Sequence, residues 1–230
     1  MAVCDIHILA QATLYLGALV AGFVIAIPIG VNRSTFQGDC ILYASTEWTD
    51  KSFTLQPSSA MNCNFPIYFS VFGLIFYGLG TGLYNLYAVL RSRKDPEIGS
   101  QMWVMPFILV NAVLAVGTLI VACIISVGFL QFCNGLTKTN QIKHCYDKEN
   151  VSFKYEKTGK MFNTGNYFKL LSVSQTGAWV ALLIWVAQIV LCVLRFVRNR
   201  RRRSAAMMDN AQQSQVTSDT SRIAELEPTA

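Results

Sequence analysis

The residues from Ile98 to Thr137 read IGSQMWVMPFILVNAVLAVGTLIVACIISVGFLQFCNGLT, and none of them carries a charge. About 20 consecutive apolar residues in a helix cross the hydrocarbon core of a bilayer, so this stretch is long enough to span a membrane. Three further stretches of the same character, the first with only the neutral His7, run over Ile6–Asn32, Met61–Leu90 and Leu170–Leu194. The pattern predicts membrane-spanning helices near residues 8–31, 65–90, 103–130 and 172–197.

The composition excludes a soluble protein. Of the 230 residues, 53% are hydrophobic and only 14% are charged, whereas a soluble domain carries about a quarter charged residues. The four spans and their loops fill residues 1–197 and leave no separate soluble core. The tail, residues 198–230, is basic and then polar, and we expect it to be disordered. The predicted fold class is an all-α membrane protein, a four-transmembrane-helix bundle with small disulfide-bonded outer loops.

Three features predict that both termini lie in the cytoplasm, in a secretory-pathway or plasma membrane. Arginines and lysines gather directly after the second and fourth spans, and positive residues near span ends favour the cytoplasmic side. Paired cysteines lie in the other two loops, as an oxidising compartment permits. Both Asn-x-Ser/Thr sequons, at Asn32 and Asn150, also lie there and are the candidate glycosylation sites. The lysines of the second outer loop oppose the charge rule, which weakens in long loops.

The cysteines of the outer loops are Cys40, Cys63, Cys133 and Cys145, and they allow three pairings. We expect Cys40 to pair with Cys63 and Cys133 with Cys145, because pairing within a loop requires the least ordering of the chain. A crossed pairing that ties the two loops together stays open. In the chain-entropy model such a bond stabilises its loop by about 3 kcal/mol.

The residues of both outer loops favour packed structure. In the first loop, Cys40–Tyr43 and Ser52–Leu55 have the composition of a short β-hairpin around a turn at Asp50-Lys51. The second loop is rich in Phe and Tyr as well as Lys. We therefore expect it to pack either on the membrane surface or on the first loop.

Two pairs of small residues lie four positions apart within spans: Gly17 with Ala21, and Gly78 with Gly82. Small residues let helix backbones approach closely in lipid. We expect these pairs to pack helices within the bundle, with a self-association face as the alternative. Amide side chains in or near the spans can bond across helices; they belong to Asn85, Asn111, Gln175 and Gln188.

The sequence contains no residue set that indicates catalysis. It has no Gly-x-Ser-x-Gly or Cys-x-x-Cys motif and only two histidines, so we expect neither an enzyme nor a metal or other cofactor site. The four apolar stretches themselves also contain no charged residue. This argues against a transporter or channel, which more often places ionisable groups in the membrane.

A dense basic cluster follows the fourth span and comprises Arg198, Arg200, Arg201, Arg202 and Arg203. The main role that we expect for this cluster is to fix which side of the membrane the C-terminus lies on. It is also a candidate contact for anionic lipid, where each residue contributes about 1 kcal/mol near the membrane surface. We expect the lipid bilayer, membrane proteins or further copies of the chain as partners, and no nucleic acid.

Several short motifs resemble the transmembrane protein 179 family. The first outer loop reads Phe36-Gln-Gly-Asp-Cys-Ile-Leu-Tyr43, similar to that family's Phe-x-Gly-x-Cys-x-Leu-Tyr, and Pro57-Ser-Ser-Ala60 is similar to its B branch. Cys133-Asn134 and Gln175-Thr-Gly-Ala-Trp179 are similar at the expected spacing. The resemblance extends over residues 1–197. It implies a multi-pass membrane protein with cytoplasmic termini, and it implies no catalytic activity or transported substrate.

Claudin-like proteins resemble the chain less closely. Their first loop carries Gly-Leu-Trp and a close cysteine pair, whereas here Trp48 stands alone and Cys40 and Cys63 are 23 positions apart. Taken together, the sequence favours a structural, interaction or trafficking protein whose outer loops contact partners. The alternative is a small oligomeric pore or transporter.

Overall fold

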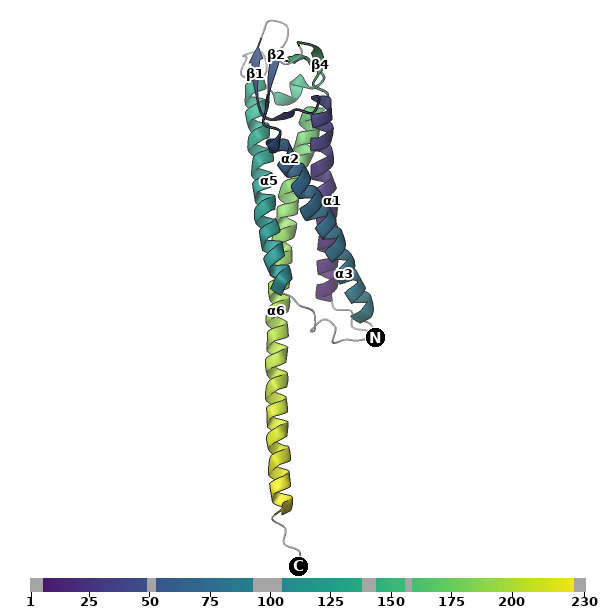
Figure 1. Ribbon diagram of the computed structural model, residues 1–230, viewed down its shortest axis with the longest axis vertical. Helices are drawn as coiled ribbons and strands as arrows, with labels where there is room; N and C mark the ends of the chain where they lie inside the picture. The colour runs from purple at the N-terminus through teal and green to yellow at the C-terminus, as the bar shows by residue number, and fades with distance from the viewer. Residues whose placement is uncertain (1–5, 49–52, 93–104, 138–143, 156–158, 226–230) are drawn as a thin grey trace, which may run out of the picture.

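The computed structural model describes residues 6–48, 53–92, 105–137, 144–155 and 159–225. Four helical stretches are long and apolar enough to cross a membrane: Ile6–Thr35, Met61–Arg91, Met105–Thr137 and Tyr167–Arg201. They confirm the four predicted spans, each of which extends beyond its predicted bounds at one end or both. In Figure 1 the helices run side by side with a small sheet at one end of the bundle, the sheet end. Helix α1 begins at the opposite end.

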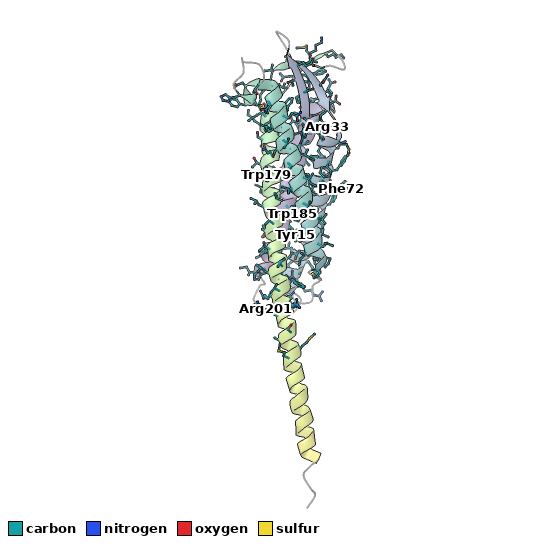
Figure 2. All side chains as sticks on the ribbon, turned by 90° about the vertical axis from the view of Figure 1, so that its left-hand side faces the viewer. Tyr15, Arg33, Phe72, Trp179, Trp185 and Arg201 are labelled. Atoms are coloured by element: carbon teal, nitrogen blue, oxygen red, sulfur yellow. A yellow bond between two sulfur atoms is a disulfide. The ribbon has the colours of Figure 1, made fainter. Side chains whose placement is uncertain are left out.

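The first and last helices form the centre of the bundle. Helix α1 (Ile6–Thr35) packs along both α6 (Tyr167–Glu225) and α3 (Tyr77–Ser92), and α5 (Met105–Thr137) packs along α6. Residues on the outside of the bundle are also apolar, as expected for helices surrounded by lipid. Figure 2 shows Tyr15 and Trp185 at the same level inside the bundle, where their rings are 6.2 Å apart.

The second span is not a uniform α-helix. It begins as α2 (Met61–Phe69), passes through the π-helical segment η1 (Ser70–Phe76) and continues as α3. Helix α1 approaches η1 at Gly22, where an added Cβ would lie 3.2 Å from the carbonyl oxygen of Ser70 and 2.7 Å from Ile75. A larger residue than glycine would therefore push the two backbones apart.

Both loops at the sheet end contribute to a single sheet with the strand order β1-β2-β3-β4. Strands β1 (Cys40–Trp48) and β2 (Phe53–Ser58) pair antiparallel, which confirms the predicted hairpin, although its turn at Asp50-Lys51 lies outside the described residues. Strands β3 (Ser152–Tyr155) and β4 (Met161–Asn163) come from the second loop, and β3 pairs parallel to β2. Of the two placements expected for the second loop, the structure has packing on the first loop.

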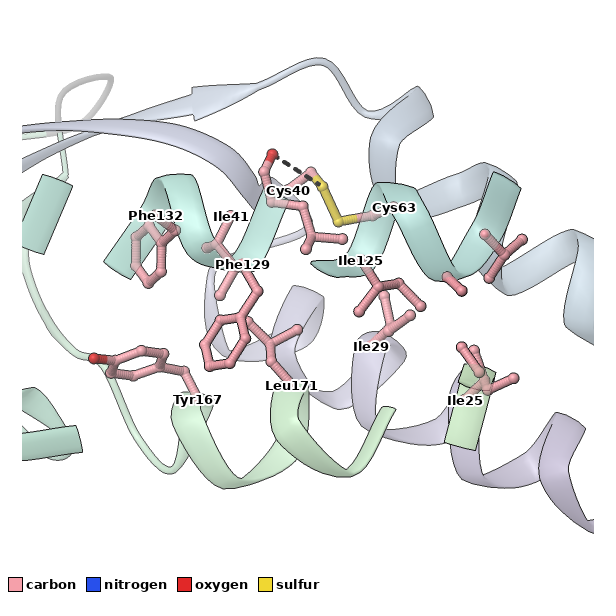
Figure 3. Close-up of a cluster of buried hydrophobic side chains, with 14 of the residues drawn as sticks. Ile25, Ile29, Cys40, Ile41, Cys63, Ile125, Phe129, Phe132, Tyr167 and Leu171 are labelled. Atoms are coloured by element: carbon pink, nitrogen blue, oxygen red, sulfur yellow. Dashed lines mark hydrogen bonds between the residues drawn. A yellow bond between two sulfur atoms is a disulfide. The ribbon is translucent and has the colours of Figure 1, made fainter. Parts of the chain in front are cut away.

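Beneath the sheet, apolar side chains from three helices meet in one core. Figure 3 shows Ile29 of α1, Ile125 and Phe129 of α5, and Leu171 of α6 converging below the Cys40–Cys63 bond. Above them the buried rings of Phe36 and Phe153 stack with centroids 5.2 Å apart. The sheet and the bundle therefore share a continuous hydrophobic core, and the sheet is held rigidly on the helices.

The last helix differs from the prediction of a disordered tail. Helix α6 continues past the bundle to Glu225 and stands clear of the other helices (Figure 1). Residues 204–225 contain neither proline nor glycine and include several alanines, methionines and glutamines. These residue types favour a helix, so the turn-by-turn hydrogen bonding of α6 continues into the polar segment without a break.

Candidate functional site: the sheet module and the polar interior

Two disulfides fix the loops at the sheet end. Cys40, the first residue of β1, is bonded to Cys63 in α2 with a Cα–Cα distance of 5.7 Å. Cys133 in the last turns of α5 is bonded to Cys145 of the short helix η2 (Cys145–Lys148), with a Cα–Cα distance of 5.3 Å. Each bond lies within one loop, as expected, and each ties that loop to the end of a helix.

The second loop is also held by an aromatic contact with the start of α6. The buried Tyr167 donates its hydroxyl hydrogen bond to the carbonyl oxygen of Cys145. Its ring meets Phe132 of α5 edge to face, with centroids 5.3 Å apart. Tyr167 thus connects η2, α5 and α6 at the base of the sheet, beside the Cys133–Cys145 bond.

The outward face of the sheet is polar and carries charges of both signs, because Glu47 of β1 and Lys154 of β3 are both exposed in the same register. Ser152 and Lys154 of β3 and Met161 of β4 are exposed, while Phe153 between them points into the core. Tyr146 in η2 is exposed as well, and its ring stacks on His144 with centroids 5.1 Å apart. We call the exposed Lys154, Lys160 and Met161 beside and on the edge strand β4 the sheet face.

The two sequons lie in different surroundings. Asn150 is exposed in a turn and has a positive φ of 59°, a conformation that asparagine tolerates. Asn32 lies inside α1, and its side chain is only 2% exposed. The candidate Asn32 is thus enclosed in the folded chain, because α1 runs on to Thr35 and carries the side chain into the bundle.

One amide connects all four helices of the bundle. Asn111 of α5 is fully buried; its Nδ2 donates to the hydroxyl oxygen of Tyr15 in α1 at 2.8 Å, and its Oδ1 accepts from the hydroxyl of Tyr77 in α3 at 3.3 Å. The same Nδ2 lies 3.6 Å from the Sγ atom of Cys192 in α6. Asn111 therefore fulfils the expected role of an amide that bonds across helices.

A second set of polar contacts lies one to two turns closer to the opposite end. The carbonyl oxygen of Gln11 accepts from Nε2 of Gln188 at 2.8 Å, and its side-chain Oε1 accepts from Nη1 of Arg195 at 3.0 Å. Gln11 Nε2 in turn donates to Cys192 Sγ at 3.1 Å. Buried polar groups in a low-dielectric interior need such partners, and here the partners come from α1 and α6.

Sequence reasoning found Asn111 and Gln188 but missed Gln11, Tyr15 and Arg195. Arg195 lies just past the uncharged stretch that ends at Leu194, and its side chain is buried. The spacing of these polar residues along their helices could have revealed that they face the interior of the bundle. Residues 11 and 15, and residues 188, 192 and 195, recur three or four positions apart and so share one face of their helices. Of the other amides, Gln175 bonds Ser126 on α5, while Asn85 bonds the Thr81 carbonyl of its own helix.

The small-residue pairs lie at helix contacts within the bundle. An added Cβ at Gly78 would lie 2.9 Å from the carbonyl oxygen of Tyr15, and one at Gly82 would lie 3.2 Å from Leu16. Gly17 faces Ile184 of α6, and Ala21 is buried. This placement is that of packing inside one chain, the first of the two expected roles.

The basic cluster lies where α6 leaves the bundle. Arg198, Arg200 and Arg201 are exposed, and Figure 2 shows Arg201 at the start of the free part of the helix. The side chains of Arg202 and Arg203 lie outside the described ones. Among the described residues, no three His, Cys, Asp or Glu side chains come together as metal ligands.

Comparisons with known proteins agree with this architecture. Residues 7–224 match the family model described as Transmembrane protein 179/179B Claudin domain. The chain is 23% identical to Transmembrane protein 179B of Danio rerio over 192 residues, which cover 82% of this chain and 83% of the relative. It is 24% identical to Transmembrane protein 179B of Homo sapiens over 189 residues, 81% of each chain. No solved structure gave a significant match.

The family match corrects one part of the sequence analysis. The isolated Trp48 and the wide spacing of Cys40 and Cys63 had argued against a claudin-like protein, yet the matching family model is a claudin domain. The chain thus matches a claudin-domain model although it lacks the Gly-Leu-Trp motif and the close cysteine pair. The chain belongs to the transmembrane protein 179/179B family and carries its claudin domain.

Proposed function

We propose that this chain is a structural, interaction or trafficking protein, and not an enzyme, whose sheet face contacts a partner outside the membrane. The observation that supports this most is the joint construction of the sheet by both loops, each tied to a helix by a disulfide. A surface that is rigid before binding loses little conformational entropy on contact. A rigid surface of this kind suits binding to a partner better than a transport cycle in which the surface must change conformation.

The chemistry of the sheet face suggests an acidic partner. Lys154, Lys160 and Met161 are exposed next to one another in sequence or across the β3–β4 pairing. Strand β4 is one of the two edge strands of the sheet, and edge strands can pair with a strand of another protein. The partner we propose is a protein with an acidic strand or loop, bound to β4 and to the lysines beside it.

The orientation that fits this function places the sheet end in the lumen or outside the cell and both termini in the cytoplasm. Disulfides persist on the oxidising side of secretory-pathway and plasma membranes. The exposed arginines at the start of the free part of α6 suit the cytoplasmic leaflet, where they contact anionic lipid. Asn150 is then the glycosylated residue.

A pore within one chain is less favoured. Tyr15, Tyr77 and Trp185 fill the middle of the bundle, with ring centroids 6.1 to 6.2 Å apart. An ion path would have to run between several copies of the chain. Association of copies through the apolar outer surface would serve the structural function equally well.

Chemical cross-linking with a membrane-impermeant amine reagent tests this proposal. In intact cells, or in microsomes opened to expose the lumen, Lys154 and Lys160 should form cross-links to one acidic partner. Met161→Glu should abolish these cross-links, because it places a negative charge on the edge strand. The matched control is Met208→Glu, an exposed methionine on the free part of α6, which should leave them unchanged. Reaction of these lysines from the cytoplasmic side, equal cross-linking by both variants, or a voltage-dependent current in reconstituted bilayers would contradict the proposal.

A further inference from the structure

An apolar groove of about 590 Å³ runs along the outside of the bundle between the second span and α5. On the second span it reaches from Asn64 in the first turn of α2 to Tyr77 at the start of α3, and Val110 and Leu114 of α5 form the opposite wall. Figure 2 shows Phe72, an exposed residue that lines the groove, on the outer surface of the bundle. Both walls belong to membrane-spanning helices, so a molecule that fills the groove comes from the lipid phase.

The groove extends over one leaflet of the membrane. It begins beside the sheet, because Asn64 directly follows Cys63, which is bonded to Cys40 of β1. From Asn64 to Tyr77 a helix rises about 20 Å at about 1.5 Å per residue, and one leaflet contributes about 15 Å of hydrocarbon. Tyr68 is exposed near the start of the groove, as is typical of tyrosines at the level of the lipid headgroups. The groove therefore suits a lipid of a single leaflet with its polar end toward the sheet.

The second-span wall of the groove is aromatic and closely packed. The ring of Phe69 lies on Gly117 of α5, where an added Cβ would come within 2.3 Å of the ring atom Cε2. Phe65 packs against Phe69 with ring centroids 5.8 Å apart, and Gly73, one turn farther along, lines the groove without a side chain. A flat, rigid ligand suits such a wall, because it loses less conformational entropy on binding than a flexible acyl chain does.

The polar end of the groove is a single oriented amide. Arg33 of α1 donates from Nη1 to Oδ1 of Asn64 and from Nε to the carbonyl oxygen of Gly38 at 2.6 Å. The oxygen of Asn64 is therefore occupied, whereas its Nδ2 group has no acceptor among the described residues and can donate to a ligand. None of the described residues that line the groove is charged. This combination favours a neutral lipid with one small polar group over a phospholipid with a charged headgroup.

We propose that this groove binds a membrane sterol, with the hydroxyl oxygen accepting a hydrogen bond from Nδ2 of Asn64. The planar ring system lies between the aromatic wall at Phe69 and Phe72 and the aliphatic wall at Val110 and Leu114. A sterol meets each requirement of the groove: it is rigid and flat, it occupies one leaflet, and its only polar group is at one end. The site is separate from the sheet face and does not depend on a partner there.

Photolabelling of the full chain in phosphatidylcholine nanodiscs tests the assignment. The probe is a photoreactive, alkyne-tagged cholesterol, and the labelled peptides should come from residues 61–77 and 105–118, which contain the two walls. Unlabelled cholesterol should compete fully. Its 3α epimer, epicholesterol, directs the hydroxyl away from Asn64 and should compete about fivefold more weakly, as expected for loss of one hydrogen bond.

Two exposed valines of α5 provide matched variants. Val110→Phe fills the groove and should weaken the apparent affinity for the probe about tenfold, as overpacking of a close-fitting site does. Val116→Phe adds the same ring about 240° farther around the helix, at 100° per residue, and should leave labelling unchanged. An unchanged melting temperature would show that Val110→Phe still folds, and the competition experiments on the wild type do not depend on this variant.

Label spread over all four spans, or equal effects of Val110→Phe and Val116→Phe, would overturn the groove as the binding site. Competition by diacylglycerol as strong as that by cholesterol would overturn the sterol assignment in favour of a neutral acyl lipid. Loss of labelling in nanodiscs that hold two chains would overturn it in favour of a second copy that covers the groove.

Discussion

The ring of Tyr43 in β1 lies against Gly128 of α5, so close that an added Cβ at Gly128 would come within 2.8 Å of Cε2 of the ring. Tyr43 has a positive φ of 65°, and the β1–β2 register shifts between Cys40 and Ser45. This irregularity turns the strand toward the helix. The bulge on the strand and the missing side chain on the helix together let the sheet lie directly on the bundle.

Replacement of Gly128 by valine should therefore destabilise the protein. The new side chain cannot fit without moving Tyr43, and overpacking of this kind costs about 1–3 kcal/mol. Thermal unfolding in detergent should show a lower melting temperature. Gly80→Val is the matched control, because nothing lies within 4 Å of an added Cβ at this position in α3. Equal melting temperatures for the two variants would contradict the contact.

Asn111→Leu should loosen the bundle through loss of hydrogen bonds. The change removes the acceptor for Tyr77 and the donor to Tyr15, and each hydrogen bond across membrane helices contributes about 0.6–2 kcal/mol. We expect faster unfolding in detergent and greater susceptibility to proteolysis. Thr118→Val serves as control, because Thr118 is a buried polar residue on the same helix whose hydroxyl donates to the Leu114 carbonyl one turn back in that helix. An effect of Thr118→Val as large as that of Asn111→Leu would refute the role of Asn111 across helices.

The sequence predicted those parts of the fold that depend on residues close together in the chain. Uncharged runs such as 98–137 specify spans by length alone, and the disulfides follow from loop membership and short closure. The β1–β2 hairpin also follows from neighbouring residues. Each of these features depends on residues close together in the chain, where composition and spacing can be read directly.

The parts that were missed depend on contacts between distant residues. Pairing of β3 with β2 joins Lys154 to Thr54, and no local pattern in either strand specifies the other. Burial of Arg195 depends on Gln11, which belongs to the other end of the sequence. Asn32 lay in a plausible sequon, but only the continuation of α1 through the loop boundary shows that its side chain is buried.

Glycosidase treatment should distinguish the two sequons. Asn150 is exposed in a turn, so Asn150→Gln should remove any glycosidase-sensitive mass shift of the protein from cells. Asn32→Gln should leave that shift unchanged because the side chain is enclosed by the bundle. A shift that survives Asn150→Gln, or one lost in Asn32→Gln, would be inconsistent with this arrangement.

The two disulfides should contribute unequally to stability. Cys40 and Cys63 are both buried and 23 positions apart, whereas Cys133 and Cys145 are partly exposed and 12 apart. In the chain-entropy model the longer loop gains slightly more than the shorter one, about 3 kcal/mol in each case. Buried serines at Cys40 and Cys63 would add the cost of polar groups in an apolar core.

The double variant Cys40→Ser/Cys63→Ser should thus melt at a lower temperature than Cys133→Ser/Cys145→Ser. Both should keep the helical content of the wild type in circular dichroism, because insertion of the four spans depends on their apolar length. Cys123→Ser is the control: Cys123 is a free, exposed cysteine of α5, and its replacement should leave the melting temperature unchanged. A lower melting temperature for Cys133→Ser/Cys145→Ser than for Cys40→Ser/Cys63→Ser would contradict this prediction. It would show that the core beneath β1 contributes less to stability than its burial implies, because the entropy of loop closure differs only slightly between the two bonds.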